Sequence, residues 1–83
     1  MSRKAKSEEP VVANRVEEAR AAQSITRQDL AERVGVHYQT IGYIERGEYS
    51  PSLVLALQIS RALAKPVEHL FWLDLEKELE KEK

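Results

Sequence analysis

The 83-residue sequence contains no cysteine. Disulfide bridges and thiolate metal sites are therefore excluded, and this composition is typical of proteins in a reducing cytosol. The chain also lacks any run close to the roughly 18 apolar residues of a membrane-spanning helix. Its first residues, MSRKAKSEEP, lack the apolar stretch that a signal peptide needs. We therefore expect a cytoplasmic protein that makes no contact with a membrane.

A strong charge of either sign is missing too, since 13 basic and 14 acidic side chains leave a net charge of −1. Domains that bind nucleic acids are often strongly basic, so this balance argues mildly against such a partner. The tail at 74–83 carries five acids and three lysines, hence −2, and residues 1–73 therefore sum to +1. A nearly neutral body can bind DNA if its basic groups share one face. The charge leaves the question open.

Groups suited to catalysis are scarce. The two histidines, His37 and His69, lie far apart in the sequence, and a metal site needs several ligands together. The serines lack a plausible histidine and acid as partners, and no glycine-rich phosphate loop occurs. We expect neither enzymatic activity nor a cofactor nor a metal ion.

Glycine and proline occur three times each, and most of them mark the ends of segments with helical periodicity. Asn14 is a suitable N-cap for a first helix, with Glu17 at the capping-box spacing, and Thr26 and Ser52 can cap later helices. Gly35 ends the second helix as a left-handed residue. The expected helices run from 14 to about 23, from 26 to 35, from 36 or 37 to 47, from 52 through LVLALQISRALA, and from 66 onward. The fold class is therefore predicted as all-α, a compact five-helix domain.

The domain organisation follows from the same reading. Residues 1–13 are predicted as a flexible basic arm, residues 14–73 as the folded domain, and residues 74–83 as a charged C-terminal tail. The fourth expected helix is apolar nearly all round, which predicts that it is the most buried element.

The third expected helix lies in the stretch VGVHYQTIGYIERGEYSPS. Projected at 100° per residue, Ile41 and Ile44 share one face. The opposite face carries Gln39, Gly42, Tyr43 and Arg46 at i, i+3, i+4 and i+7. A purely structural helix more often exposes Glu and Lys, whereas Gln39 offers a fork matched to N6 and N7 of adenine. Tyr43 can reach a thymine methyl group, a base edge or a phosphate.

The spacing of Ala31, Gly35, Ile41 and Ile44 describes two helices that cross closely at a tight turn. Here the chain resembles the Cro/C1-type helix-turn-helix family, also called the xenobiotic-response-element family, over residues 14–73. The stretch ITRQDLAERVGVHYQTIGYIERGEYSPSLVLALQISRAL carries the resemblance. It implies a phage-repressor-like fold and a sequence-specific regulator of transcription on double-stranded DNA, most simply a repressor.

The resemblance also implies roles for single residues. Positions that face base edges or the adjacent backbone are matched by His37, Tyr38, Gln39 and Tyr43. Positions that contact phosphates are matched by Arg27, Arg46, Tyr49 and Ser52, although Tyr49 also suits a loop anchor. Arg20 and Glu45 match a partly buried ion pair that joins the first and third helices.

The sequence departs from the family pattern at several positions. His37 stands where serine or threonine usually caps the helix, and Gly42 replaces a residue with a side chain. Ala64 stands where the family often has glycine. Glu48 stands where lysine or arginine is common, which puts one phosphate contact in doubt.

The C-terminal segment is too apolar for a simple tail, since it contains Phe71, Trp72, Leu73 and Leu75. Its spacing fits either a helix or a strand. We expect it to form a homodimer interface that sets two third helices about 34 Å apart on a palindromic operator. Alternatively, Trp72 and Leu73 close the domain's own core. As a whole, the chain also fits the DNA-binding antitoxin of a toxin pair, or a protein-interaction module on the same scaffold.

Overall fold

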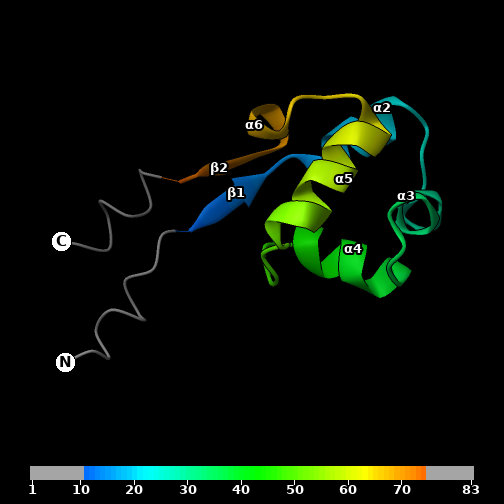
Figure 1. The fold of residues 1–83 in the computed structure, drawn as a ribbon, viewed down its shortest axis with the longest axis horizontal. Coiled ribbons are helices and arrows are strands. Elements are labelled where there is room, and N and C mark those ends of the chain that lie inside the picture. Colours follow the sequence, from blue (N-terminus) through cyan, green and yellow to red (C-terminus); the bar gives the residue numbers. More distant parts are fainter. Residues whose placement is uncertain (1–10, 75–83) are drawn as a thin grey trace, which may run out of the picture.

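Residues 11–74 are described by the computed structural model, and most of them are helical (Figure 1). The elements follow in the order β1 (Val12–Asn14), α2 (Val16–Ala22), α3 (Arg27–Val34), α4 (Tyr38–Glu45), α5 (Leu53–Leu63), α6 (Val67–Leu70) and β2 (Phe71–Leu73). The five expected helices are thus found within these residues, and the third of them is α4. A purely all-α fold is not confirmed, because β1 and β2 form a two-stranded sheet.

The two strands lie side by side and project from the helical body (Figure 1). They are antiparallel, with Val12 opposite Leu73, Ala13 opposite Trp72, and Asn14 opposite Phe71. Backbone hydrogen bonds continue the pairing on both sides. The N–H of Asp74 donates to the carbonyl of Val11 at 2.7 Å, and the N–H of Arg15 donates to that of Leu70 at 3.0 Å. The sheet therefore joins the beginning and the end of the folded domain.

This pairing corrects the predicted boundary of the N-terminal arm. Residues 11–13 are not a flexible segment, because they pair with the strand that follows α6. The rest of the predicted arm, residues 1–10, lies outside the described residues, as does the predicted tail from 75 to 83. For Phe71–Leu73, the strand alternative is the correct one.

The first helix begins later than predicted. Its N-cap is Arg15, which makes no side-chain capping bond, so the predicted capping box of Asn14 and Glu17 is wrong. The amide of Asn14 still bonds to the start of α2, and it also reaches α4. Its Oδ1 accepts from the N–H of Val16 at 3.0 Å, and its Nδ2 donates to the carbonyl of Ile44 at 3.0 Å. Asn14 therefore ties the strand to the C-terminal end of α4.

The ends of α3 and α5 follow the sequence signals. Thr26 and Asp29 cap α3 reciprocally, each side chain accepting from the other's backbone N–H. Gly35 ends the helix with φ 75°. The hydroxyl of Ser52 accepts from the N–H of Leu55 at 3.1 Å and so caps α5. These caps fix the connections on either side of α4.

The core lies between α2, α3, α4, α5 and α6. Its largest fully buried side chains are Leu30, Ile41, Ile44, Ile59, Leu63, Leu70 and Val16. Ile41 and Ile44 are 0% and 1% exposed, as the helical projection predicts. The burial of a large aliphatic side chain is worth about 1.5–3 kcal/mol, so these two residues hold α4 firmly on the body.

Ala64 ends α5 in the left-handed conformation, with φ 54° and ψ 42°. A Cβ in this region costs roughly 1–2 kcal/mol, whereas glycine avoids the clash and only loses more chain entropy on folding. We therefore expect Ala64→Gly to raise the free energy of unfolding by about 1 kcal/mol in a urea titration. Gly35→Ala is the reverse substitution at the matching position, the left-handed end of α3. A Cβ at Gly35 would meet no atom within 4 Å, so this substitution tests the backbone conformation alone. A lower stability of Ala64→Gly would contradict this account.

Candidate nucleic-acid interface

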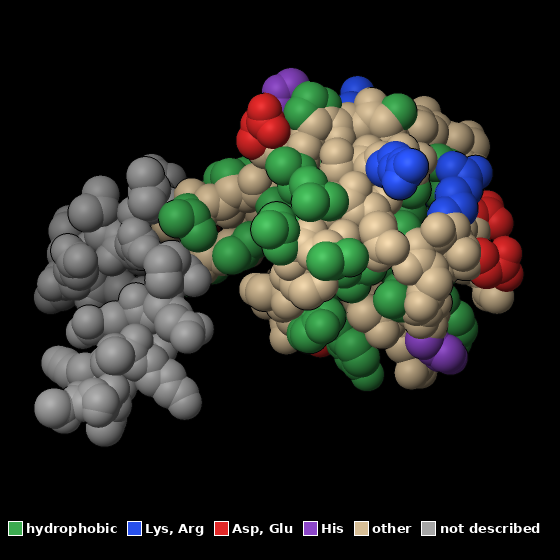
Figure 2. Space-filling view, viewed as in Figure 1, with side chains coloured by type: hydrophobic (Ala, Val, Ile, Leu, Met, Phe, Trp, Pro, Cys, Tyr) green, Lys and Arg blue, Asp and Glu red, His purple; other side chains and the backbone are tan. Residues whose placement is uncertain are grey.

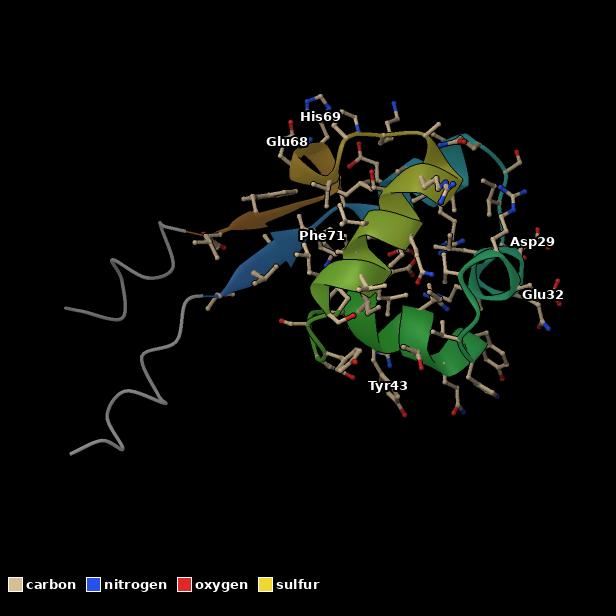
Figure 3. The ribbon with its side chains drawn as sticks, in the orientation of Figure 1. Asp29, Glu32, Tyr43, Glu68, His69 and Phe71 are labelled. Carbon is tan, nitrogen blue, oxygen red and sulfur yellow. The ribbon has the colours of Figure 1, made fainter. Side chains whose placement is uncertain are left out.

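The outer face of α4 is open to solvent and polar. Gln39 is exposed, and the tyrosine side chains of Tyr38 and Tyr43 are 47% and 45% exposed. Tyr43 points outward from α4, away from the helices that pack behind it (Figure 3). A shallow cavity of about 150 Å³ is lined by Arg27, Tyr38, Gln39, Gly42, Tyr43 and Arg46. The residues predicted to face DNA on α4 therefore share one accessible surface.

Gly42 is an exception to the helical projection. It is buried, although it was expected on the outer face. The guanidinium of Arg46 covers it, since a Cβ built at Gly42 would lie 3.3 Å from Nη1 of Arg46. The missing side chain thus makes room for Arg46 and leaves no surface of its own for DNA.

His37 is the N-cap of α4. Its Nδ1 accepts from the backbone N–H of Gln39 at 3.1 Å, so histidine replaces the usual hydroxyl cap. Its ring also stacks on Tyr38, with centroids 4.9 Å apart and an interplanar angle of 28°. Because Nδ1 accepts from the backbone, Nε2 is the ring nitrogen that can bond to a group outside the protein.

Glu45, on the inner side of α4, accepts from arginines of two other helices. Nε and Nη2 of Arg20 lie 2.7 and 3.2 Å from its two carboxylate oxygens, and Nε of Arg27 lies 2.9 Å from Oε1. The side chain of Glu45 is 1% exposed and that of Arg20 is 12% exposed. Arg20 also donates to the carbonyl of Ile25 at 3.0 Å. The carboxylate therefore fastens α4 to α2 and to the start of α3.

The contact of Arg27 with Glu45 was missed by the sequence analysis, which assigned Arg27 to a phosphate. The hydrogen bond that Arg27 donates to Glu45 and the negative charge of that carboxylate raise the pKa of Arg27 above its ordinary value. The Arg27 side chain is still 43% exposed at the edge of the α4 surface. No local signal predicts this contact, because Arg27 and Glu45 are 18 residues apart in the sequence.

Arg46 follows the last residue of α4 and is paired within the chain. Its Nε lies 3.2 Å from Oε2 of Glu48, and its Nη2 lies 3.4 Å from Oε1. In the loop that continues to α5, Tyr49 is 48% exposed, and the Ser52 hydroxyl is engaged as the α5 cap. The four side chains that sequence analysis assigns to phosphates thus border α4, but two arginines already hold carboxylates.

The arrangement of these helices agrees with the family that the sequence matches. The profile of a family described as Helix-turn-helix matches residues 16–70, which include α2 through α6. The chain belongs to the Cro/C1-type helix-turn-helix family of DNA-binding transcriptional regulators.

Similar proteins come from bacteria and archaea. An uncharacterized HTH-type transcriptional regulator of Bacillus subtilis, YgzD, is 46% identical over 63 residues, which cover 76% of this chain and 96% of that protein. A regulator of the same description from Methanothermobacter thermautotrophicus is 50% identical over 60 residues, covering 71% of this chain and 87% of that one.

Solved structures show the same fold. The restriction-modification controller protein C.AhdI from Aeromonas hydrophila is similar with a TM-score of 0.62 and 30% identity, over 65% of this chain and 82% of that chain. A putative DNA-binding protein from Bacteroides fragilis has a TM-score of 0.68 at 24% identity, over 74% of this chain and 98% of that chain, which shows the fold alone.

The surface away from α4 carries apolar side chains. Trp72 and Leu73 are 37% and 51% exposed, so they do not simply close the core, whereas Phe71 is half-buried and packs against it. Leu75 lies outside the described residues. The guanidinium of Arg15 lies over the Trp72 ring, 4.6 Å from its centroid. Part of the predicted dimer surface is therefore accessible.

The same face extends onto α5. Leu53, Val54 and Leu57 are 72%, 66% and 49% exposed, so α5 is not buried all round as its composition predicts. Figure 2 shows hydrophobic side chains gathered on the face where α5 and the two strands lie. We call Leu53, Val54, Leu57, Trp72 and Leu73 the apolar face.

Two further observations concern residues 11–74. None of their helices combines the length and the apolar character that crossing a membrane requires. No group of three or more His, Cys, Asp or Glu side chains in this part of the chain is placed to hold a metal ion.

Proposed function

We propose that the protein is a sequence-specific transcriptional repressor that binds a palindromic operator as a homodimer, with α4 in the major groove. One observation carries the proposal. Ile41 and Ile44 are fully buried, while Gln39 and Tyr43 on the other side of α4 are exposed. A helix fixed by its apolar side and open on its polar side is suited to the major groove, which admits an α-helix.

Base recognition is led by α4. The amide of Gln39 can donate to N7 and accept from N6 of adenine, and Tyr43 lies beside it in the same cavity. Tyr38 and His37, stacked at the start of α4, reach a base edge or the adjacent backbone. Side chains on a rigid helix keep a defined register, which base discrimination needs.

Phosphate contacts surround this helix. Arg27 and Arg46 line the same cavity as Gln39, and Tyr49 and Ser52 belong to the loop before α5. The first N–H groups of α5 add a partial positive charge that attracts phosphate. These groups orient the protein on the duplex and carry no sequence information themselves.

The homodimer supplies the second half-site. The apolar face is exposed in a single chain, and its burial against a second copy would remove it from water. A two-fold axis would then present two α4 helices to half-sites about one turn of B-DNA apart. A dimer that occupies such an operator represses transcription by excluding other proteins from the same DNA.

The experiment is selection of bound duplexes from a random pool, followed by a salt titration of the selected site. We expect a palindromic motif and an affinity that falls as the salt concentration rises. The absence of binding to any duplex at low salt would reject DNA binding and favour a protein-interaction module.

Replacement of Gln39 by alanine tests the base reader. We expect base preference to relax at one position in each half-site and affinity to fall by about 10- to 100-fold for each half-site, because each bidentate pair is worth about 1–3 kcal/mol. Gln58→Ala is the matched control, because Gln58 is an exposed glutamine on α5, and it should change neither the affinity nor the base preference. Unchanged preference in Gln39→Ala would remove this assignment.

A further inference from the structure

Arg46 and Glu48 form a two-bond pair at the end of α4. Nε and Nη2 of the guanidinium lie 3.2 and 3.4 Å from the two carboxylate oxygens, and the side chains are 51% and 55% exposed. This carboxylate stands beside the surface that we propose meets DNA. Glu48 therefore occupies the N–H groups of Arg46 that would otherwise be available to a DNA phosphate.

The backbone places Glu48 at this position. Gly47 has φ 77°, and its N–H donates to the carbonyl of Ile44 at 3.0 Å. The N–H of Glu48 donates to the carbonyl of Tyr43 at 2.9 Å. These two bonds are those of a Schellman motif, which turns the chain back over the last turn of the helix. Glu48 is thus directed to Arg46 by the way α4 ends.

The helix surface holds Arg46 from the other side. Its guanidinium lies 5.4 Å from the centroid of the Tyr43 ring, and its Nη1 lies against Gly42, where a Cβ would be 3.3 Å away. Three contacts, from a ring, a bare backbone and a carboxylate, therefore keep the arginine flat along α4. An ordinary exposed arginine has many more conformations.

We propose that Glu48 is an internal competitor of DNA phosphate for Arg46, an inference that rests on the proposed function. Carboxylate and phosphate oxygens both accept paired hydrogen bonds from a guanidinium. Glu48 takes the Nε and Nη2 edge of Arg46, and Nη1 lies against Gly42, so a phosphate that binds this edge has to displace the carboxylate. Binding of DNA exchanges the carboxylate for a phosphate and leaves a negative charge of Glu48 close to the duplex. Glu48 thereby lowers the affinity for every duplex, because a phosphate contact is independent of sequence.

This device weakens background binding to non-operator DNA, and it lowers the affinity for the operator by the same factor. A chain with fewer effective cations gains less from phosphates, and base contacts on α4 then account for a larger share of the affinity.

The test compares Glu48→Gln with Glu68→Gln. Both changes remove one exposed acid and keep the shape, and Glu68 lies in α6, far from Tyr43 in Figure 3. Dissociation constants are measured on the selected duplex and on a random duplex over a series of salt concentrations. We expect Glu48→Gln to tighten both complexes by about two- to fivefold for each subunit on the DNA, the fold-change that one exposed ion pair represents. Its salt slope should steepen by about 0.9 for each subunit, and Glu68→Gln should change neither quantity appreciably.

Arg46→Gln in both backgrounds completes the cycle. If Glu48 acts through Arg46, the gain from Glu48→Gln disappears when Arg46 is absent. Thermal melting shows whether each variant is folded. A wild-type protein that binds DNA while Glu48→Gln behaves like Glu68→Gln would overturn the inference and leave the proposed function intact. A wild-type protein that binds no duplex would reject both.

Discussion

Replacing Glu45 by alanine is expected to lower the free energy of unfolding by about 3–5 kcal/mol, the usual cost of removing one partner from a buried ion pair. Glu45 is 1% exposed and accepts from both Arg20 and Arg27. Without it, the guanidinium of Arg20 stays largely buried and keeps only its bond to the carbonyl of Ile25. The free energy of unfolding of a small domain is only about 5–15 kcal/mol, so this loss would be a large fraction of the stability. Urea denaturation measures it.

Paired substitutions separate the burial of charge from the packing of the side chains. The double change of Arg20→Met with Glu45→Leu removes both charges and keeps apolar volume. It should recover most of the stability that Glu45→Ala loses, because apolar replacement of a buried pair is often close to neutral. Arg27→Ala should cost less than Glu45→Ala, since Arg27 is the more exposed partner. A loss below about 1 kcal/mol for Glu45→Ala would contradict a buried, charge-dependent connection between α2, α3 and α4.

The helices were predictable because their ends are decided by neighbouring residues. Thr26 with Asp29, Ser52, and Gly35 act over one turn, and the structure contains each of these caps or stops. The face of α4 that packs on the core was predictable for a similar reason, since the burial of Ile41 and Ile44 follows from the helical period alone.

The pairing of the two strands was not predictable from local pattern. The spacing after Phe71 left a strand open, but β1 has only three residues, too few to establish an alternation, and Asn14 pairs with Phe71 across almost the whole domain. A capping signal at Asn14 also competed with this pairing. The tertiary arrangement decided, and the Asn14 amide bonds to α4 instead of forming a capping box.

Side-chain partners were predictable only in part. The pairing of Arg20 with Glu45 came from the family resemblance, whereas the bond from Arg27 to the same carboxylate depends on how closely α3 and α4 cross. The contact of Arg46 with Glu48 had a local signal, because the two residues flank Gly47 at the end of a helix. Composition misled for α5, since a nearly uniform apolar helix is buried only where something covers it.

Breaking the apolar face should abolish dimers and most DNA binding. We expect Trp72→Glu to sediment as a monomer, because a carboxylate placed in an apolar interface loses its hydration. Affinity for the palindromic site should fall by about 100-fold or more, since one tethered half-site no longer assists the other. Analytical ultracentrifugation and a binding titration on the same samples measure the two effects together.

Two further substitutions distinguish the effect of placing glutamate in the apolar face from the effect of the added negative charge alone. Leu53→Glu changes a side chain that is 72% exposed, so the fold of a single chain tolerates it, and it should give the same monomer if α5 belongs to the interface. Ala21→Glu adds the same charge to the exposed side of α2 and should leave the dimer intact. A wild-type protein that sediments as a monomer while still selecting a palindrome would show that dimers form only on DNA. In that case the apolar face would not hold two free chains together, and the two α4 helices would be brought into register by the operator itself.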